Sequence, residues 1–180
     1  KGDRKRRAGE SAPEARELVN LSDIRVKTYP ELLAEAGASV GLINPLPLWP
    51  PLELDGGFCV AGMLTPPTTD RWVHPPEMGP ELDELGYRID VRYGDRPYGF
   101  VDDDLFGEVS LSILRDDMFD VLDARVRATK HAVVEHDLDY LYSLLKSIDV
   151  IQHCFWAHMA NDDPTYGDAI LESYRRVDDL

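Results

Sequence analysis

The chain has 180 residues, 43% of them hydrophobic, which is enough for one compact domain with a real core and short for two. Its 34 acidic and 19 basic residues give a net charge of −15, which repels a phosphate backbone and excludes extended binding to DNA or RNA. No stretch approaches the roughly 20 apolar residues of a membrane helix, and the charged first residues contain no apolar signal core, so we expect a soluble, cytoplasmic protein without membrane contact.

The acidic residues and the cysteines both indicate the environment of the protein. The acid excess is mostly Asp, while Lys is scarce after the first few residues. This balance resembles that of proteins from salt-loving organisms, whose carboxylate surface stays hydrated while salt screens its self-repulsion. Cys59 and Cys154 have no second cysteine near either of them, so we expect buried thiols, which fit a reducing compartment, and no disulfide framework.

The first half of the chain predicts a short arm followed by α/β structure. Residues 1–20 contain too few large apolar side chains to hold a core position, so a flexible charged arm is expected before one domain over residues 21–180. Pro30 and Gly37 predict a helix between them, because proline suits a first helical turn and glycine suits the backbone just after a helix. The apolar run 39–44 then predicts a strand covered on both faces.

Proline-rich segments follow this strand. Residues 45–51 include four prolines, which cannot donate the hydrogen bonds of a sheet, so they predict an extended loop packed on its own domain. A proline-rich ligand for a recognition module is the alternative. A second strand is expected over residues 58–62, after a turn at Gly56 and Gly57. The proline pairs between residues 66 and 76 predict a second long loop, of the kind that often shapes a binding cleft.

The second half predicts a strand, a long helix, a strand and a final helix. Residues 85–93 alternate in polarity, as in a half-buried strand. Residues 107–135 carry apolar side chains every three or four positions, as in a long helix with one face in the core. The apolar run 139–148 is expected to be a central strand that ends just before Asp149, and residues 164–180 are expected to form a helix.

Asp149 and His153 form the most informative pattern of the sequence. They place a carboxylate at the end of an apolar run and an imidazole four residues later. Ligands of open α/β sheets gather at the carboxyl ends of strands, where Asp149 is expected to lie. Carboxylate oxygen and neutral imidazole nitrogen suit zinc and are acceptable to manganese. Alone the pattern is weak, because Asp149 equally suits the cap of a following helix.

Residues 147–156, Ser-Ile-Asp-Val-Ile-Gln-His-Cys-Phe-Trp, resemble a motif of alkaline-phosphatase-superfamily phosphodiesterases, in which a strand ends in Asp and Gln-His and an aromatic pair follow. Residues 32–45 and 50–66 look like the central portion of the type I phosphodiesterase and nucleotide pyrophosphatase branch, and residues 173–178 resemble a later helix of it. The resemblance covers the chain from about residue 20 onward. It implies a partial alkaline-phosphatase-like fold, with a mostly parallel sheet flanked by helices and with long proline-rich loops.

The resemblance also implies hydrolysis of a phosphoric ester. In that family two metal ions, usually zinc and sometimes manganese, flank a Thr or Ser nucleophile that attacks phosphorus. Asp149 and His153 match the residues that hold one of these ions. His74 lies in a loop that matches a segment near the active site, so it is a candidate for binding substrate. The implied substrate is a small phosphate ester or nucleotide, and a diester or pyrophosphate is favoured over a monoester. Sulfatases and phosphomutases share the metal chemistry of this superfamily, so the substrate stays open.

Other parts of the family's site do not occur in these 180 residues. Its first metal-binding Asp, its nucleophile in a Thr/Ser-Gly context and its Asp-His-Gly motif are all missing. We therefore expect the middle of a longer enzyme, inactive by itself, with weak or no metal binding because zinc sites normally use at least three protein ligands. The alternative is a non-catalytic binding or interaction module that keeps the α/β scaffold. The oligomeric state is not indicated by any pattern.

Two further patterns are assigned to solvent-exposed polar residues. Residues 131–136, His-Ala-Val-Val-Glu-His, resemble an inverted zinc-protease motif, but one residue too many separates the first His from Glu. We therefore interpret His131 and His136 as ordinary side chains on the surface of the helix. The acidic run 102–104 lacks the alternating spacing and the glycine of a calcium loop, and is interpreted as solvated acid.

Overall fold

The computed structural model describes residues 20–63, 65–66, 69–90, 92–93, 96–97 and 111–178. In chain order its elements are η1 (Leu21–Asp23), α1 (Tyr29–Glu35), β1 (Val40–Ile43), β2 (Phe58–Val60), β3 (Val73–His74), α2 (Met78–Glu84), β4 (Arg92–Tyr93), β5 (Arg96–Pro97), α3 (Leu111–Glu135), β6 (Tyr140–Ser143), α4 (Ser147–Ala160) and α5 (Ala169–Asp178). The predicted arm, apart from Asn20, and the acidic run 102–104 lie outside the described residues.

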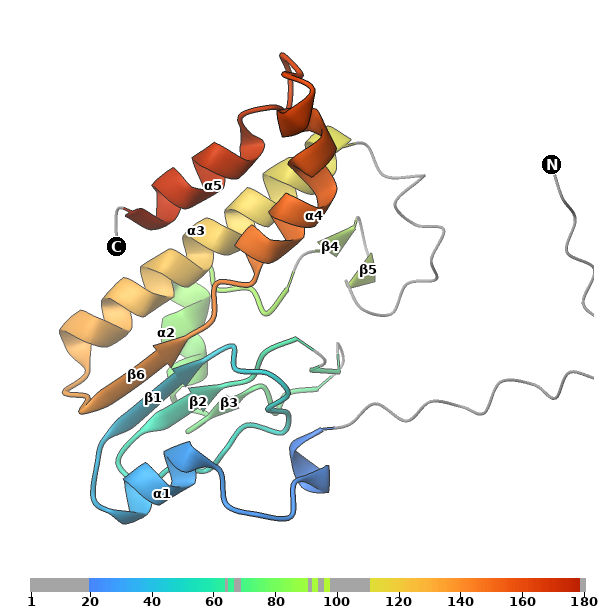
Figure 1. Ribbon diagram of the computed structural model, residues 1–180. Helices are drawn as coiled ribbons and strands as arrows, with labels where there is room; N and C mark the ends of the chain where they lie inside the picture. The colour runs from blue at the N-terminus through green and yellow to red at the C-terminus, as the bar shows by residue number, and fades with distance from the viewer. Residues whose placement is uncertain are drawn as a thin grey trace, which may run out of the picture.

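Four strands form the main sheet in the order β3-β2-β1-β6 (Figure 1). β1 pairs in parallel with both β2 and β6, whereas β2 and β3 are antiparallel. β4 and β5 form a separate antiparallel pair. The predicted α/β class with a mostly parallel sheet is therefore confirmed.

The sheet is covered on both faces because successive side chains of β1 and β2 point in opposite directions. Val40, Leu42 and Cys59 are buried on the face that carries α1. Ile43 and Phe58 are buried on the other face, against α2 and α3. Figure 1 shows α1 on one side of the sheet and the longer helices on the other. The expected burial of the first strand on both faces is confirmed.

The connection from β1 to β2 is the proline-rich segment 44–57, which is fully described and contains no helix. Parallel strands need a crossover, and a helix usually supplies the apolar cover. Here Leu48, Leu52 and Leu54 from the loop are buried against the sheet in place of a helix. The predicted packing of this loop on its own domain is confirmed.

Local sequence signals set the ends of α1 and the start of β2. The backbone N–H and the hydroxyl of Thr28 both donate to Glu31 Oε2, each at 2.7 Å, and begin the helix. Gly37 has a φ of +90°, as a residue just after a helix requires. Gly57 leaves no room for a side chain, since a Cβ there would lie 2.1 Å from the carbonyl oxygen of Val40. The helix and both early strands form where the sequence predicts them.

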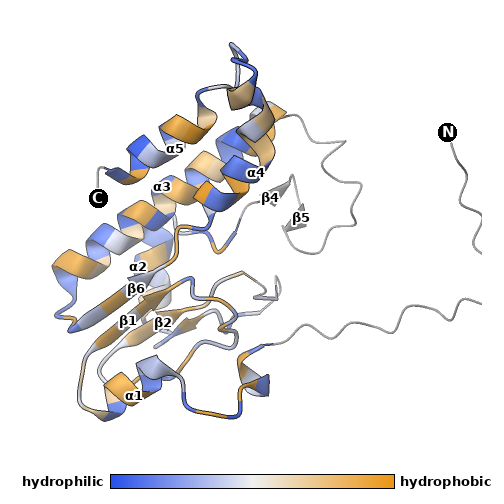
Figure 2. Cartoon of the chain, in the orientation of Figure 1, coloured by the Kyte–Doolittle hydropathy of each residue, from blue (hydrophilic) through white to orange (hydrophobic). Residues whose placement is uncertain are grey.

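Helices α3, α4 and α5 form a second layer that packs on itself. Apolar and polar residues alternate along each of these helices in Figure 2, as expected for helices with one buried face. Their shared core contains Leu114, Met118, Val121, Ile151, Phe155 and Ile170. Within the described ranges, no helix combines the length and the apolar character needed to cross a membrane. The predicted long helix is confirmed over the described part of its range, and α5 confirms the final helix.

The predicted strand over residues 85–93 is wrong. The helix α2, which the sequence did not indicate, ends at Glu84, and Gly86 follows with a φ of +69°. Tyr87 is buried by stacking on Trp72, with ring centroids 6.1 Å apart, and not by sheet pairing. Among the described residues of this range, only Arg92 and Tyr93 of β4 form a strand, which belongs to the separate ribbon. Alternation over a few residues did not distinguish a strand from an irregular segment packed on the core.

The predicted central strand over residues 139–148 is also wrong in extent and position. β6 is only four residues long and is the last strand in the sheet order, and α4 begins at Ser147. A short apolar run suits a strand or a buried helix equally well. Lys146 occupies the N-cap position without a side-chain cap hydrogen bond, so the usual signal for a helix start is missing. Asp149 consequently lies in the first turn of α4.

We expect Phe155→Ala to lower the free energy of unfolding by about 3–5 kcal/mol, because it opens a cavity where α3, α4 and α5 meet. Urea denaturation followed by circular dichroism measures this change. Ile113→Ala, on the exposed side of α3, is the control and should cost less than about 1 kcal/mol. Equal losses in the two variants would contradict the packing of the helical layer.

The two thiols should differ in reactivity. Burial raises the pKa of Cys59 to about 12, so almost none of it is thiolate near neutral pH. Burial also raises the pKa of Cys154, but this side chain is only partly buried. We expect iodoacetamide to label Cys154 in the native protein and Cys59 only after denaturation, as peptide mass spectrometry would show. Rapid labelling of native Cys59 would contradict its position in the core.

Candidate functional site

The carboxyl ends of β1 and β6 lie side by side at one edge of the sheet. From β1 the chain passes to β2 on one side, whereas β6 pairs on the other side of β1. Loops that leave a parallel sheet in opposite directions create a crevice, and ligands of open α/β sheets bind there. The residues that follow these two strands therefore form the candidate site.

Asn44, directly after β1, joins the loops at this edge. Its Nδ2 donates to the carbonyl oxygen of Leu144 after β6, at 3.0 Å, and its Oδ1 accepts from the backbone N–H of Met63 after β2, at 3.1 Å. The side chain is fully buried and the residue has a φ of +57°. A Cβ on Gly62 would lie 2.5 Å from Asn44 Oδ1, so glycine is needed beside the amide. One buried amide thereby positions three segments.

A group of charged residues lies at the start of α4. Lys146 is partly buried, and its amine contacts the sulfur of Met63. Burial lowers the pKa of Lys146, and the nearby Arg125 adds to this effect, while Asp90 and Asp149 oppose it. The N-terminus of a helix also carries a partial positive charge. The start of α4 therefore combines a partly buried amine and the positive end of the helix with the carboxylates of Asp90 and Asp149.

Arg125 links α3 to the same place. Its guanidinium is almost completely buried, donates to the carbonyl oxygen of Ile89, and lies 3.5 Å from the hydroxyl of Ser147. Its two terminal nitrogens have these acceptors, whereas its Nε is buried without a hydrogen-bond partner among the described residues. The contact holds the first residue of α4 against the middle of α3.

Asp149 and His153 lie on successive turns of α4, with Asp149 Oδ1 and His153 Nε2 3.5 Å apart. Their side chains are 66% and 78% exposed. With Gln152 and Trp156 they line a surface depression of about 270 Å³. The structure thus brings the two predicted ligands together, although it does so by helical spacing and not at the end of a strand, because residues four apart share one face of a helix.

The structure does not bring His74 to this pair. His74 lies in β3, beside a separate depression of about 280 Å³ that Glu53 and Asp70 also line. β3 and β6 are at opposite ends of the sheet order, three strand spacings or roughly 14 Å apart. A role of His74 in binding substrate stays a prediction that the geometry leaves unsupported.

The described residues contain one group of three potential metal ligands, Glu81, His131 and His136. Neither Asp149 nor His153 belongs to such a group within these ranges. The two histidines are partly buried, and both pair with Glu81 from α2, a contact that their interpretation as ordinary surface side chains did not include. No sequence spacing indicated this contact, since Glu81 lies 50 residues before His131.

Comparisons with known proteins do not assign a family. No family model matches the sequence, no curated protein matches it, and no solved structure matches the fold. The resemblance to alkaline-phosphatase-superfamily phosphodiesterases therefore depends on the residues of the motif, and stays a prediction.

We expect Asn44→Ala to lower the free energy of unfolding by about 2–4 kcal/mol, because it leaves two backbone groups without their partner in the core. Thermal and urea unfolding measure the loss. Asn161→Ala is the matched control, because the amide of Asn161 also donates to a carbonyl oxygen but does so on the surface. A loss for Asn44→Ala no larger than that of the control would contradict its role as the link between the loops.

Proposed function

We propose that this chain is the metal-binding portion of a metal-dependent phosphoric ester hydrolase of the phosphodiesterase and nucleotide pyrophosphatase type. The observation that carries the proposal is the pair Asp149 and His153, with ligand atoms 3.5 Å apart at the start of α4. A tetrahedral zinc ion with bonds of about 2.0–2.1 Å holds neighbouring ligand atoms roughly 3.3 Å apart. The separation of the pair therefore matches that of two ligands on one zinc ion, and manganese accepts the same donors.

The surroundings of the pair suit a phosphate ester. The N-terminus of α4 presents backbone N–H groups and the positive end of the helix dipole, which favour a phosphate oxygen. Lys146 adds a cation next to Asp149. Trp156, exposed beside His153, offers an aromatic face to a nucleobase or another planar group of a nucleotide-type substrate.

The residues of this chain have distinct roles in the proposed reaction. Asp149 and His153 would hold a metal ion, which would supply Lewis acidity toward the phosphoryl oxygens. Lys146 and the helix N-terminus stabilise the negative charge that the substrate brings. Buried Asn44 and Arg125 hold the start of α4 in position. The nucleophile and the second set of ligands belong, in this proposal, to residues outside these 180.

The same proposal includes a partial alkaline-phosphatase-like fold. The parallel strands, the proline-rich loops and the helices on both faces support it. In the described part of the chain no strand pairs with the outer edge of β6, so further strands of a larger sheet have a place to pair. This edge lies next to the start of α4, so strands that pair with it would bring additional ligands toward Asp149.

A non-catalytic binding module is the second candidate, and one observation favours it. Within the ranges that the structure describes, no third Cys, His, Asp or Glu joins Asp149 and His153 in a metal-sized group. Two protein ligands bind metal weakly, because catalytic zinc sites normally use three. The exposed Trp156 would then serve recognition without chemistry.

The test is hydrolysis of bis(p-nitrophenyl) phosphate, with zinc or manganese, by the natural protein that contains these residues. We expect Asp149→Ala and His153→Ala each to lower kcat/KM on the order of 100-fold or more, because each removes a direct metal ligand. His158→Ala is the matched control, since this histidine of the same helix pairs with Asp163 at 2.9 Å and should leave activity nearly unchanged.

Activity that survives loss of both ligands would contradict the proposal. The 180-residue chain is measured in the same assay as the natural protein, and it should show no turnover. Turnover by this chain that disappears with Asp149→Ala would show that a hydroxyl such as that of the buried Thr65, or a metal-bound water, completes the site within these residues. Absence of hydrolysis in the natural protein, with unchanged fold, would favour the binding module.

A further inference from the structure

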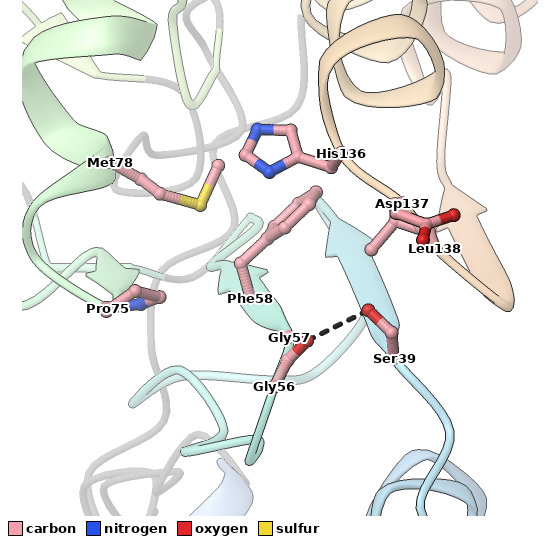
Figure 3. Close-up of a pocket in the computed structure, with 9 residues that line it drawn as sticks. All are labelled: Ser39, Gly56, Gly57, Phe58, Pro75, Met78, His136, Asp137 and Leu138. Atoms are coloured by element: carbon pink, nitrogen blue, oxygen red, sulfur yellow. Dashed lines mark hydrogen bonds between the residues drawn. The ribbon is translucent and has the colours of Figure 1, made fainter.

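A second group of metal-ligating side chains lies at the opposite edge of the sheet. A cavity of about 260 Å³ is lined there by Ser39, Gly57 and Leu138, which precede β1, β2 and β6. His136 lines the same cavity, and Figure 3 shows its ring between Phe58 of the sheet and Met78 of α2. This edge is separate from the site at Asp149.

Three ligand atoms converge beside this cavity. Glu81 Oε1 lies 2.5 Å from His131 Nε2 and 3.1 Å from His136 Nε2, and all three ligand atoms lie within 4.8 Å of one another. Their side chains are 28–34% exposed, so they are partly shielded and still accessible to an ion from solution. The three residues come from α2, from α3 and from the residue just after α3.

The packing around the histidines restricts their rings. The ring of His136 packs against Phe58, with centroids 5.2 Å apart, and against His131 edge-on at 6.1 Å. Both Nε2 atoms point at the same carboxylate oxygen, so the two rings already have the orientation that a shared ion needs. Preorientation of this kind lowers the entropy cost of binding a metal.

The hydrogen bonds with the two histidines also act on the pKa of Glu81. Burial alone raises the pKa of Glu81, but the hydrogen bonds with His136 and His131 outweigh burial and hold this pKa below its ordinary value. Glu81 is therefore ionised near neutral pH. The net charge of −15 also raises the concentration of cations around the protein.

We propose that Glu81, His131 and His136 form a zinc site that joins α2 to the C-terminal end of α3. Two imidazole nitrogens and one carboxylate oxygen are a donor set that zinc binds with a fourth position filled by water. A tetrahedral ion requires ligand atoms roughly 3.3 Å apart, which small side-chain rotations provide from the observed spacing. This site is independent of the proposed hydrolase function, and its role is to hold α2 against the sheet.

Zinc binding replaces the direct hydrogen bonds in this group. In the zinc-bound state each neutral imidazole carries its single proton on Nδ1. A proton that stood on Nε2 passes to Nδ1 by way of solvent or, from an imidazolium, is released to solvent, and the Nε2 lone pairs and one carboxylate oxygen then bind the ion. The segment 78–86 is short and consists mainly of the seven-residue helix α2, whose buried side chains connect it to the core. A metal link from α2 to α3 should therefore stabilise this segment. Without zinc the same residues remain a hydrogen-bonded cluster, and the experiment separates the two states.

The test is isothermal titration calorimetry, in which the metal-free chain is titrated with ZnCl₂ at constant pH and the heat of binding is measured. We expect one zinc ion per chain in the tightest binding phase. Glu81→Gln, which keeps the shape of the side chain, and His136→Ala should each weaken this phase on the order of 100-fold or more. Glu84→Gln, an exposed change in the same helix, is the matched control and should leave it unchanged.

The two metal sites are distinguished by a double variant, Asp149→Ala with His153→Ala, which should retain the tight phase. Zinc should also raise the Tm of the wild type and of this double variant, but not that of Glu81→Gln. Circular dichroism without metal checks that each variant is folded. Tight binding that survives Glu81→Gln, or that is lost in the double variant, would overturn the proposal, as would the absence of a tight phase in the wild type.

Discussion

The hydrogen bonds of the buried Asn44 amide are the constraint on which the carboxyl edge of the sheet depends. Loops that leave parallel strands carry backbone groups that lose water and need other partners. Asn44 satisfies one such group after β2 and another after β6. Because the chain runs from Leu144 straight into α4, the same side chain sets where Asp149 lies relative to β1. The geometry of the candidate site thus depends on a side chain that supplies hydrogen bonds to buried backbone groups of the core.

The two edges of the sheet carry groups of different character, and α3 reaches both. Arg125 contacts the start of α4 at the carboxyl edge, whereas His131 contacts Glu81 near the amino edge. Arg125 and His131 are six positions apart, which is about 9 Å along the helix at 1.5 Å per residue. The pair at Asp149 is open to solvent, as a site for substrate must be. The group at Glu81 is partly buried and more complete, as suits a structural ion.

Elements with local signals could be predicted from the sequence. Pro30 in the first turn and Gly37 just after the helix marked α1, and a long apolar stripe marked α3. Elements without such signals were misplaced, since the start of α4 has no side-chain cap and the burial of Tyr87 comes from a contact with Trp72. An apolar run reports burial, but burial alone does not choose between strand, helix and packed loop.

By itself the sequence determined the α/β class and the early helix and strands, because their local signals do not depend on the rest of the fold. It also singled out Asp149 and His153, but it placed Asp149 at the end of a strand, whereas the structure pairs the two residues on one face of α4. Only the tertiary structure decided that this pair is exposed on α4 and that His74 lies far from it. It alone also revealed the contact of Glu81 with His131 and His136, since residues 50 and 55 positions apart meet through the packing of two helices on one sheet, which no local spacing encodes.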